Sequence, residues 1–252
     1  KAKSSRNHSE TMFKALKIPI KIKKTFKYDF ITLSKPKFIK KIDFNIPGDI
    51  SSASFFIVLT LLSKSSSLTI KNVNINSSRT GIIKILNRMN AKIVYKNKKK
   101  YKGEIVSDIL VKSVNNLKGI RCPKSLNSSA IDEFLIIFLV AAKAKGISTF
   151  SDLGELNKKE SPRLKWGSKI LNKIGIKNTV TKSSIKIYGN PNIKIDRRII
   201  IKNFLKDHRV FMTSVIAALS FGGNWQIFDK NSIKTSFPSF LKKVHYLGAK
   251  IV

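Results

Sequence analysis

The sequence predicts an α/β (α+β) fold made of three repeated units, and three observations support this prediction. One pattern occurs three times at a spacing of roughly 75–85 residues, which is typical of a repeated supersecondary unit. In each copy a short polar cluster opens an apolar helical run, a β-branched strand follows, and a second helix ends near a Gly or Ala beside Lys and Ile. With 252 residues, 42% of them hydrophobic, the chain is also long and apolar enough for the units to share a core.

The first unit occupies roughly 46–113. We expect Ser51 or Ser52 to cap a helix that runs to Leu62, and Thr80-Gly81 to open a second helix, with a strand at 67–70 between them. The lysine-rich run 96–102 is the densest cluster of charge, and it precedes an apolar strand at 109–111. It is therefore predicted to form a solvated hairpin tip, with a nucleic-acid contact as the alternative.

The second unit occupies roughly 114–192 and the third runs from about 193 to the end. In the second, helices are expected at 130–145 and 162–174, the latter with Ser161 as N-cap and Pro162 in its first turn, and a strand is expected at 147–150. In the third, Asp207 is expected to cap a helix through Leu219, a strand follows at 225–228, and Ser236-Phe237-Pro238 opens the last helix.

Residues 1–45 stand apart from the three units. Their pattern predicts an amphipathic helix at 9–16 and two strands at 18–23 and 26–33, which resembles the end of a further unit. The chain starts at Lys1 without an initiator Met, and we expect upstream sequence to complete this part.

The charge balance raises a second class of function. Fifty Lys and Arg against 14 Asp and Glu give a net charge of +36, which suggests a nucleic-acid-binding protein. The lysines are scattered through every segment instead of gathering in one stripe, so we expect no specific nucleic acid and attribute the excess to coding bias. The single cysteine, Cys122, is expected in a reducing compartment as a small hydrophobic residue. No apolar run reaches the roughly 20 residues of a membrane helix.

The polar clusters at the three helix starts are the candidate functional residues. Free N–H groups and the helix macrodipole favour anions, and arginine adds a bidentate fork, so Lys159, Arg163 and Arg209 are candidate anion ligands. Asp132 and Glu160 lie among these cations and are candidate acids or bases. The alternative for each residue is a salt bridge or a helix cap. No cysteine and histidine spacing indicates a metal, and no glycine-rich motif indicates a nucleotide.

Seven motifs in order resemble those of the 5-enolpyruvylshikimate-3-phosphate (EPSP) synthase family, the 3-phosphoshikimate 1-carboxyvinyltransferases. The resemblance covers essentially the whole chain. The motifs are Ser-Arg-Asn-His-Ser-Glu at 5–10, Pro-Gly-Asp-Ile-Ser-Ser-Ala at 47–53, Ser-Arg-Thr-Gly at 78–81, Ile-Asp-Glu at 131–133, Lys-Glu-Ser-Pro-Arg at 159–163, Asp-His-Arg at 207–209 and Thr-Ser-Phe-Pro at 235–238.

The resemblance implies an enzyme of the shikimate pathway of aromatic amino-acid biosynthesis, with shikimate 3-phosphate and phosphoenolpyruvate as substrates and no cofactor or metal. Asp132 aligns with the residue that accepts the hydroxyl proton, and Glu160 with the acid that handles the proton at C3 of phosphoenolpyruvate. The aligned substrate ligands are Arg163 and Arg209 for phosphoenolpyruvate, Ser5 and Lys159 for shikimate 3-phosphate, and Lys234 for a phosphate.

The family fold implies two domains of three βαβαββ units each. Residues 46–252 would then be a three-unit domain that lacks its N-terminal strand segment, and residues 1–45 the C-terminal tail of the other domain. We expect a cytoplasmic enzyme that is monomeric when complete. The alternatives are the related UDP-N-acetylglucosamine enolpyruvyl transferase, a basic nucleic-acid-binding protein, or a non-catalytic fragment. Three residues depart from the family motifs, namely Asn7, Asn157 and Pro162.

Overall fold

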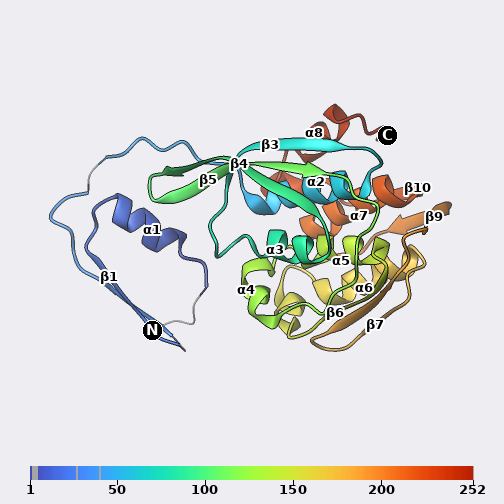
Figure 1. Cartoon of the computed structure of the whole chain (residues 1–252), viewed down its shortest axis with the longest axis horizontal. Coiled ribbons are helices and arrows are strands. Elements are labelled where there is room, and N and C mark those ends of the chain that lie inside the picture. The colour runs from blue at the N-terminus through green and yellow to red at the C-terminus, as the bar shows by residue number, and fades with distance from the viewer. Residues whose placement is uncertain (2–4, 27, 40, 252) are drawn as a thin grey trace.

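The computed structural model describes residue 1 and residues 5–26, 28–39 and 41–251 (Figure 1). Residues 2–4, 27, 40 and 252 lie outside this description. They belong to the predicted parts 1–45 and 46–252, and residue 27 also belongs to the predicted strand 26–33. The predicted α/β class is confirmed, because helices and small sheets alternate along the chain. None of the described helices combines the length and apolar character needed to cross a membrane.

The first repeat has the predicted elements with one change at its start. Helix α2 (Ile50–Leu62) is followed by β3 (Ser67–Asn74), α3 (Gly81–Arg88), β4 (Lys92–Tyr101) and β5 (Glu104–Lys112). The antiparallel sheet has the order β3-β5-β4. The cap of α2 is Asp49 and neither of the predicted serines, since its carboxylate accepts the Ser52 backbone N–H at 3.0 Å. Most of the lysine-rich run belongs to β4 itself, and the hairpin turns at Lys102 and Gly103.

The second repeat has the same sheet order. It contains the 3₁₀ turn η1 (Lys124–Leu126), α4 (Asn127–Ala130), α5 (Phe134–Lys143), β6 (Gly146–Phe150), η2 (Gly154–Lys158), α6 (Arg163–Lys173), β7 (Asn178–Val180) and β8 (Ile185–Gly189). Its antiparallel sheet runs β6-β8-β7, so the last strand is central as in the first repeat.

Two helix predictions in the second repeat were inaccurate. The predicted helix 130–145 is interrupted by a turn at 131–133, which separates α4 from α5. The N-cap of α6 is Pro162, whose carbonyl accepts the Trp166 N–H at 3.0 Å. The hydroxyl of Ser161 donates to Asp207 instead of capping the helix, because that buried carboxylate lies within 2.8 Å of it.

The third repeat is shorter. Strand β9 (Ile195–Ile201) pairs in parallel with β10 (Gly222–Ile227) across α7 (His208–Phe221), and η3 (Lys230–Thr235) and α8 (Phe240–Tyr246) follow. This βαβ arrangement recurs in the other repeats as isolated parallel bridges, Gly48 to Val73 and Arg121 to Thr149. The three repeats therefore share the start of one βαβαββ unit, and the first two complete it.

The core lies where the first helices of the repeats meet. Helices α2, α5 and α7 pack against one another, and every residue of α5 from Phe134 to Ala142 is buried. An apolar run buried on all sides explains why these helices show little amphipathic pattern in the sequence. Since the three helices pack together, their N-terminal polar clusters also come together.

The N-terminal segment lies to one side of the repeats (Figure 1). It contains α1 (His8–Ala15) and the antiparallel strands β1 (Ile20–Lys24) and β2 (Asp29–Leu33), as the sequence predicts. No residue of α1 is buried. The segment reaches the first repeat through His8, whose Nδ1 lies 2.7 Å from the carboxylate of Glu104, and through the ion pair of Arg6 with Asp132.

Candidate active site

Three carboxylates mark the N-termini of the central helices. Asp49, Glu133 and Asp207 are the N-cap residues of α2, α5 and α7. The side chains of Asp49 and Asp207 accept backbone N–H groups of their own helices, from Ser52 and Arg209. Each carboxylate also pairs with an arginine: Asp49 with Arg79, Glu133 with Arg209 and Asp207 with Arg163. The polar clusters at the three helix starts therefore lie together, and aspartates of the chain itself cap α2 and α7.

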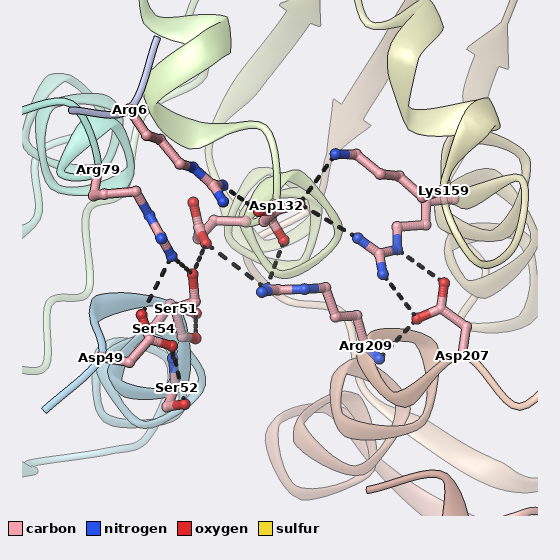
Figure 2. A network of polar contacts seen from close by, with 12 residues as sticks. Arg6, Asp49, Ser51, Ser52, Ser54, Arg79, Asp132, Lys159, Asp207 and Arg209 are labelled. Carbon is pink, nitrogen blue, oxygen red and sulfur yellow. Dashed lines mark hydrogen bonds and ion pairs between the residues drawn. The ribbon is translucent and has the colours of Figure 1, made fainter. Parts of the chain in front are cut away.

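Asp132 is the centre of the cluster. Arg6, Lys159 and Arg209 approach it from different sides (Figure 2). Its carboxylate pairs with Arg6 and lies 3.5 Å from both the Nζ of Lys159 and the Nη1 of Arg163. Burial raises the pKa of Asp132, but the charges of Arg209, Arg6 and Lys159 outweigh it and hold the pKa well below the ordinary range. Asp132 is thus an ionised group with 13% of its side chain exposed.

Arg163 is the largest fully buried side chain of the described part, at 1% exposure. Its Nε donates to Asp207 at 2.8 Å, its Nη2 lies 3.3 Å from the same carboxylate, and it also pairs with Glu160. Burial raises the pKa of Asp207, yet its bonds with Arg163 and Ser161 lower the pKa further, so Asp207 is ionised and neutralises Arg163. The remaining nitrogen of the guanidinium, Nη1, faces Asp132.

Arg209 is oriented by main-chain contacts. Its backbone N–H donates to Asp207 at 2.9 Å, and its Nη1 donates to the carbonyl oxygen of Asp132 at 2.8 Å. The same Nη1 lies 3.7 Å from the carboxylate of Glu133. Arg209 and Arg163 therefore stand on opposite flanks of Asp132, and each presents part of its guanidinium to the same space.

Lys159 and Glu160 lie on the segment that leads into α6, closer to solvent. Lys159 pairs with Glu155 at 3.1 Å as well as with Asp132. The side chain of Glu160 is 52% exposed and contacts Arg163. Four cations around Asp132, namely Arg6, Lys159, Arg163 and Arg209, together with the exposed carboxylate of Glu160, form a site that can bind multiply charged anions and transfer protons.

Nearly the whole chain resembles proteins of one known family. The sequence profile of EPSP synthase (3-phosphoshikimate 1-carboxyvinyltransferase) matches residues 1–244. The chain belongs to the EPSP synthase family. It is 37% identical over 251 residues to the 3-phosphoshikimate 1-carboxyvinyltransferase of Ruthia magnifica subsp. Calyptogena magnifica, covering 98% of this chain and 55% of that protein. It is 36% identical over 246 residues to that of Staphylococcus aureus (strain COL), covering 96% and 55%. The chain thus spans about half the length of these curated relatives.

Solved structures agree with the family assignment. EPSP synthase from Acinetobacter baumannii superposes with a TM-score of 0.87 at 31% identity, over 97% of this chain and 55% of that one. The enolpyruvyl transferase NikO from Streptomyces tendae shares the fold, with a TM-score of 0.68 at 14% identity over 94% and 51% of the two chains.

Five of the seven predicted site residues gather around Asp132, namely Asp132, Lys159, Glu160, Arg163 and Arg209. Ser5 is exposed and lines a neighbouring cavity of about 590 Å³ with Arg6. Lys234 lies exposed on η3 and makes no ion pair among the described residues. Its assignment as a phosphate ligand stays a prediction.

Four residues of the family motifs lie in the cluster although the sequence did not predict them as site residues. These are Arg6, Ser51, Arg79 and Glu133. The motifs contain all four, but only the fold shows that Arg6 reaches Asp132 across 126 positions of sequence. Cys122 is buried, and burial raises the pKa of its thiol to about 11, which agrees with the predicted hydrophobic role. Within the described ranges no group of His, Cys, Asp and Glu is arranged to hold a metal ion.

The three departures from the family motifs have local explanations. Pro162 caps α6, and Arg163 is still presented at its first position. The amide nitrogen of Asn157 donates to the Lys182 carbonyl at 3.1 Å, so it ties two loops together. The side-chain oxygen of Asn7 accepts from Asn76 at 2.9 Å.

Proposed function

We propose that the protein transfers the enolpyruvyl group of phosphoenolpyruvate to the 5-hydroxyl of shikimate 3-phosphate and releases phosphate. Membership of the EPSP synthase family supports this, and the observation that carries it is Asp132, a carboxylate kept ionised among cations. An ionised carboxylate can accept a hydroxyl proton, and the surrounding cations suit two substrates that both carry phosphate.

The proposed steps combine what the family resemblance implies with the positions of the charged groups. Asp132 takes the proton of the 5-hydroxyl of shikimate 3-phosphate while the oxygen of that hydroxyl bonds to C2 of phosphoenolpyruvate. At the same time Glu160 delivers a proton to C3. The tetrahedral intermediate then loses phosphate, Glu160 recovers the C3 proton, and the enol ether double bond forms. Arg163 and Arg209 bind the phosphate and carboxylate of phosphoenolpyruvate. Ser5 and Lys159 bind shikimate 3-phosphate, and Lys234 binds a phosphate group.

The same proposal covers the domain division. Residues 46–252 form a three-unit domain and residues 1–45 the tail of a second domain. The short third repeat supports this, because its β9–β10 pair lacks the additional strands of the other two sheets. We further propose a cytoplasmic monomer that binds no specific nucleic acid, in line with lysines that are scattered along the chain instead of gathered in one stripe.

The test uses the complete polypeptide with both substrates varied, and it measures phosphate release together with the carboxyvinyl product. We expect Asp132→Asn and Glu160→Gln to lower kcat by about 10²- to 10⁴-fold with little change in KM, since general acid–base help has that size. Asp108→Asn, which removes an acid far from the cluster, is the matched control. Near-normal turnover of both variants would contradict the catalytic roles.

A second experiment compares shikimate 3-phosphate with UDP-N-acetylglucosamine as the acceptor of the enolpyruvyl group. If UDP-N-acetylglucosamine were enolpyruvylated and shikimate 3-phosphate were not, the substrate proposal would be wrong while the reaction class stood. Arg209→Lys should raise the KM for phosphoenolpyruvate, because lysine keeps the charge but loses the bidentate fork.

A further inference from the structure

Glu133 is a buried acid for which the proposed reaction has no use. Only 1% of the residue is exposed, at the N-terminus of α5. Its Oε1 accepts the hydroxyl of Ser51 at 2.5 Å and lies 3.7 Å from Nη1 of Arg209. Ser51 is held in turn by Arg79, whose Nη2 donates to its hydroxyl at 2.6 Å. Three repeats thus contribute to one chain of contacts, from Arg79 through Ser51 and Glu133 to Arg209 (Figure 2 shows Arg79, Ser51 and Arg209).

A cap alone does not explain an acid at this position. No side-chain capping bond of Glu133 to its own helix occurs. Burying a carboxylate costs several kcal/mol unless it is paired and hydrogen-bonded, so an uncharged residue would serve a structural cap better. What Glu133 contacts instead is a hydroxyl and a guanidinium, both from other repeats.

Asp207 offers an internal comparison. It is a buried N-cap acid whose carboxylate receives Nε of Arg163 and so fixes the plane of that guanidinium. Glu133 has the corresponding place one repeat earlier and faces Arg209. Within the described part of the chain, Glu133 is the acid that forms an ion pair with the Arg209 side chain. The two arginines proposed to bind phosphoenolpyruvate are therefore each backed by a buried carboxylate.

We propose that Glu133 is a positioning residue for Arg209, held in place by Ser51 and Arg79. Together with the carbonyl oxygen of Asp132, which accepts from the same Nη1 at 2.8 Å, it keeps Nη1 turned inward, so that the rest of the guanidinium faces the anionic substrate in one orientation. A fixed fork binds phosphate or carboxylate better than a mobile one, because less side-chain entropy is lost on binding. This inference rests on the proposed function, in which Arg209 binds phosphoenolpyruvate.

The direction in which Glu133→Gln shifts the KM for phosphoenolpyruvate tests whether Glu133 positions Arg209. Glu133→Gln keeps the shape and an oxygen that can accept from Ser51, but removes the negative charge. If Glu133 acted only through its charge, its removal would make the site more positive and would lower the KM for phosphoenolpyruvate. If it positions Arg209, the KM should rise, and we expect about tenfold, with the KM for shikimate 3-phosphate within twofold of wild type.

Two further variants separate positioning from simple folding. Glu104→Gln removes another buried acid, 8% exposed and paired with His8, and should leave the KM for phosphoenolpyruvate unchanged. Ser51→Ala should shift that KM in the same direction as Glu133→Gln but by less, since it loosens Glu133 without removing it. Equal changes in Tm and KM for Glu133→Gln and Glu104→Gln would assign Glu133 a structural role and overturn the proposal.

Binding measurements keep this proposal distinct from the proposed function. Calorimetric titration of the complete polypeptide with phosphoenolpyruvate reports the site without turnover. If the wild type binds phosphoenolpyruvate but transfers nothing, the proposed function fails, while roughly tenfold weaker binding by Glu133→Gln still supports the role of Glu133. Unchanged or tighter binding by Glu133→Gln overturns that role whatever the turnover.

Discussion

Asp207→Asn isolates the buried ion pair beneath the candidate active site. Asp207 is 0% exposed, and its carboxylate receives Ser161 at 2.8 Å, Arg163 Nε at 2.8 Å and the Arg209 backbone N–H at 2.9 Å. Asparagine has nearly the same shape and caps helices about as well as aspartate, so the cap of α7 should survive. The substitution therefore removes the charge opposite Arg163, and it also replaces one accepting oxygen with an NH2 group, because donors reach both carboxylate oxygens of Asp207.

The expected loss can be worked out from these contacts. Breaking a buried ion pair by removing one partner costs about 3–5 kcal/mol, because the other charge stays buried. Arg163 keeps Glu160 and the edge of Asp132, so we expect the lower end, about 3 kcal/mol. Asp207→Ala also loses the cap, worth about 1 kcal/mol, and should cost about 4 kcal/mol.

Urea unfolding of the complete polypeptide measures this loss. Trp166 is a suitable fluorescence reporter, because it lies on α6 at 6% exposure and packs edge-on against Phe204 with ring centroids 5.9 Å apart. The double variant Arg163→Met with Asp207→Asn should be more stable than the sum of the two single losses, since no buried charge is then left unpaired. A loss below about 1 kcal/mol for Asp207→Asn would refute the reasoning that this pair holds the site.

Two other predictions concern pH and packing. Burial lowers the pKa of His208 below its ordinary 6.5, and the charge of Arg209 adds to the effect. The stability that comes from the neutral ring is therefore present above pH 6.5 and is lost as the pH falls below that value. In His208→Gln the Tm should change less between about pH 7.5 and 5.5 than in the wild type. An unchanged slope would argue against burial of the neutral ring. Gly167→Ala should destabilise by about 1–3 kcal/mol in urea unfolding, because its Cβ would lie 2.6 Å from a ring carbon of Phe138. The control is Gly154→Ala at a half-buried site, where the added Cβ would meet nothing closer than 3.6 Å.

The sequence was a good guide to the repeat and to most element types. Apolar runs that follow a polar cluster identify α2 and α7, and β-branched runs identify most strands of the first two repeats, since those signals are local. Helix ends were predicted less well. Asp49 and Pro162 cap helices that were assigned to neighbouring serines, because several polar residues compete at each start and tertiary contacts decide among them. Ser161 is the clearest case, since its hydroxyl bonds to Asp207, 46 positions away.

The candidate site was predictable where the family motifs name a role. Asp132, Lys159, Arg163 and Arg209 lie together in the structure, at helix starts of the second and third repeats, and their roles stay predictions. The partners that orient them were not predictable, because a buried carboxylate and a surface carboxylate look alike in a sequence. Glu133 and Asp132 are adjacent, yet the first lies at 1% residue exposure and the second has 13% of its side chain exposed.

That difference in burial divides the acids of the cluster into two kinds. Asp207 and Glu133 are enclosed, and the Asp207–Arg163 contact has the 2.8 Å length of a charge-assisted hydrogen bond. Asp132 lies 3.5 Å from both Lys159 and Arg163, which is longer than such a bond, and part of its carboxylate meets solvent. An arriving anion can therefore take up Lys159 and the free edge of Arg163 without disturbing the buried pairs. The enclosed acids hold the arginines, while Asp132, which also pairs with Arg6, is the acid that we propose accepts the proton of the substrate hydroxyl.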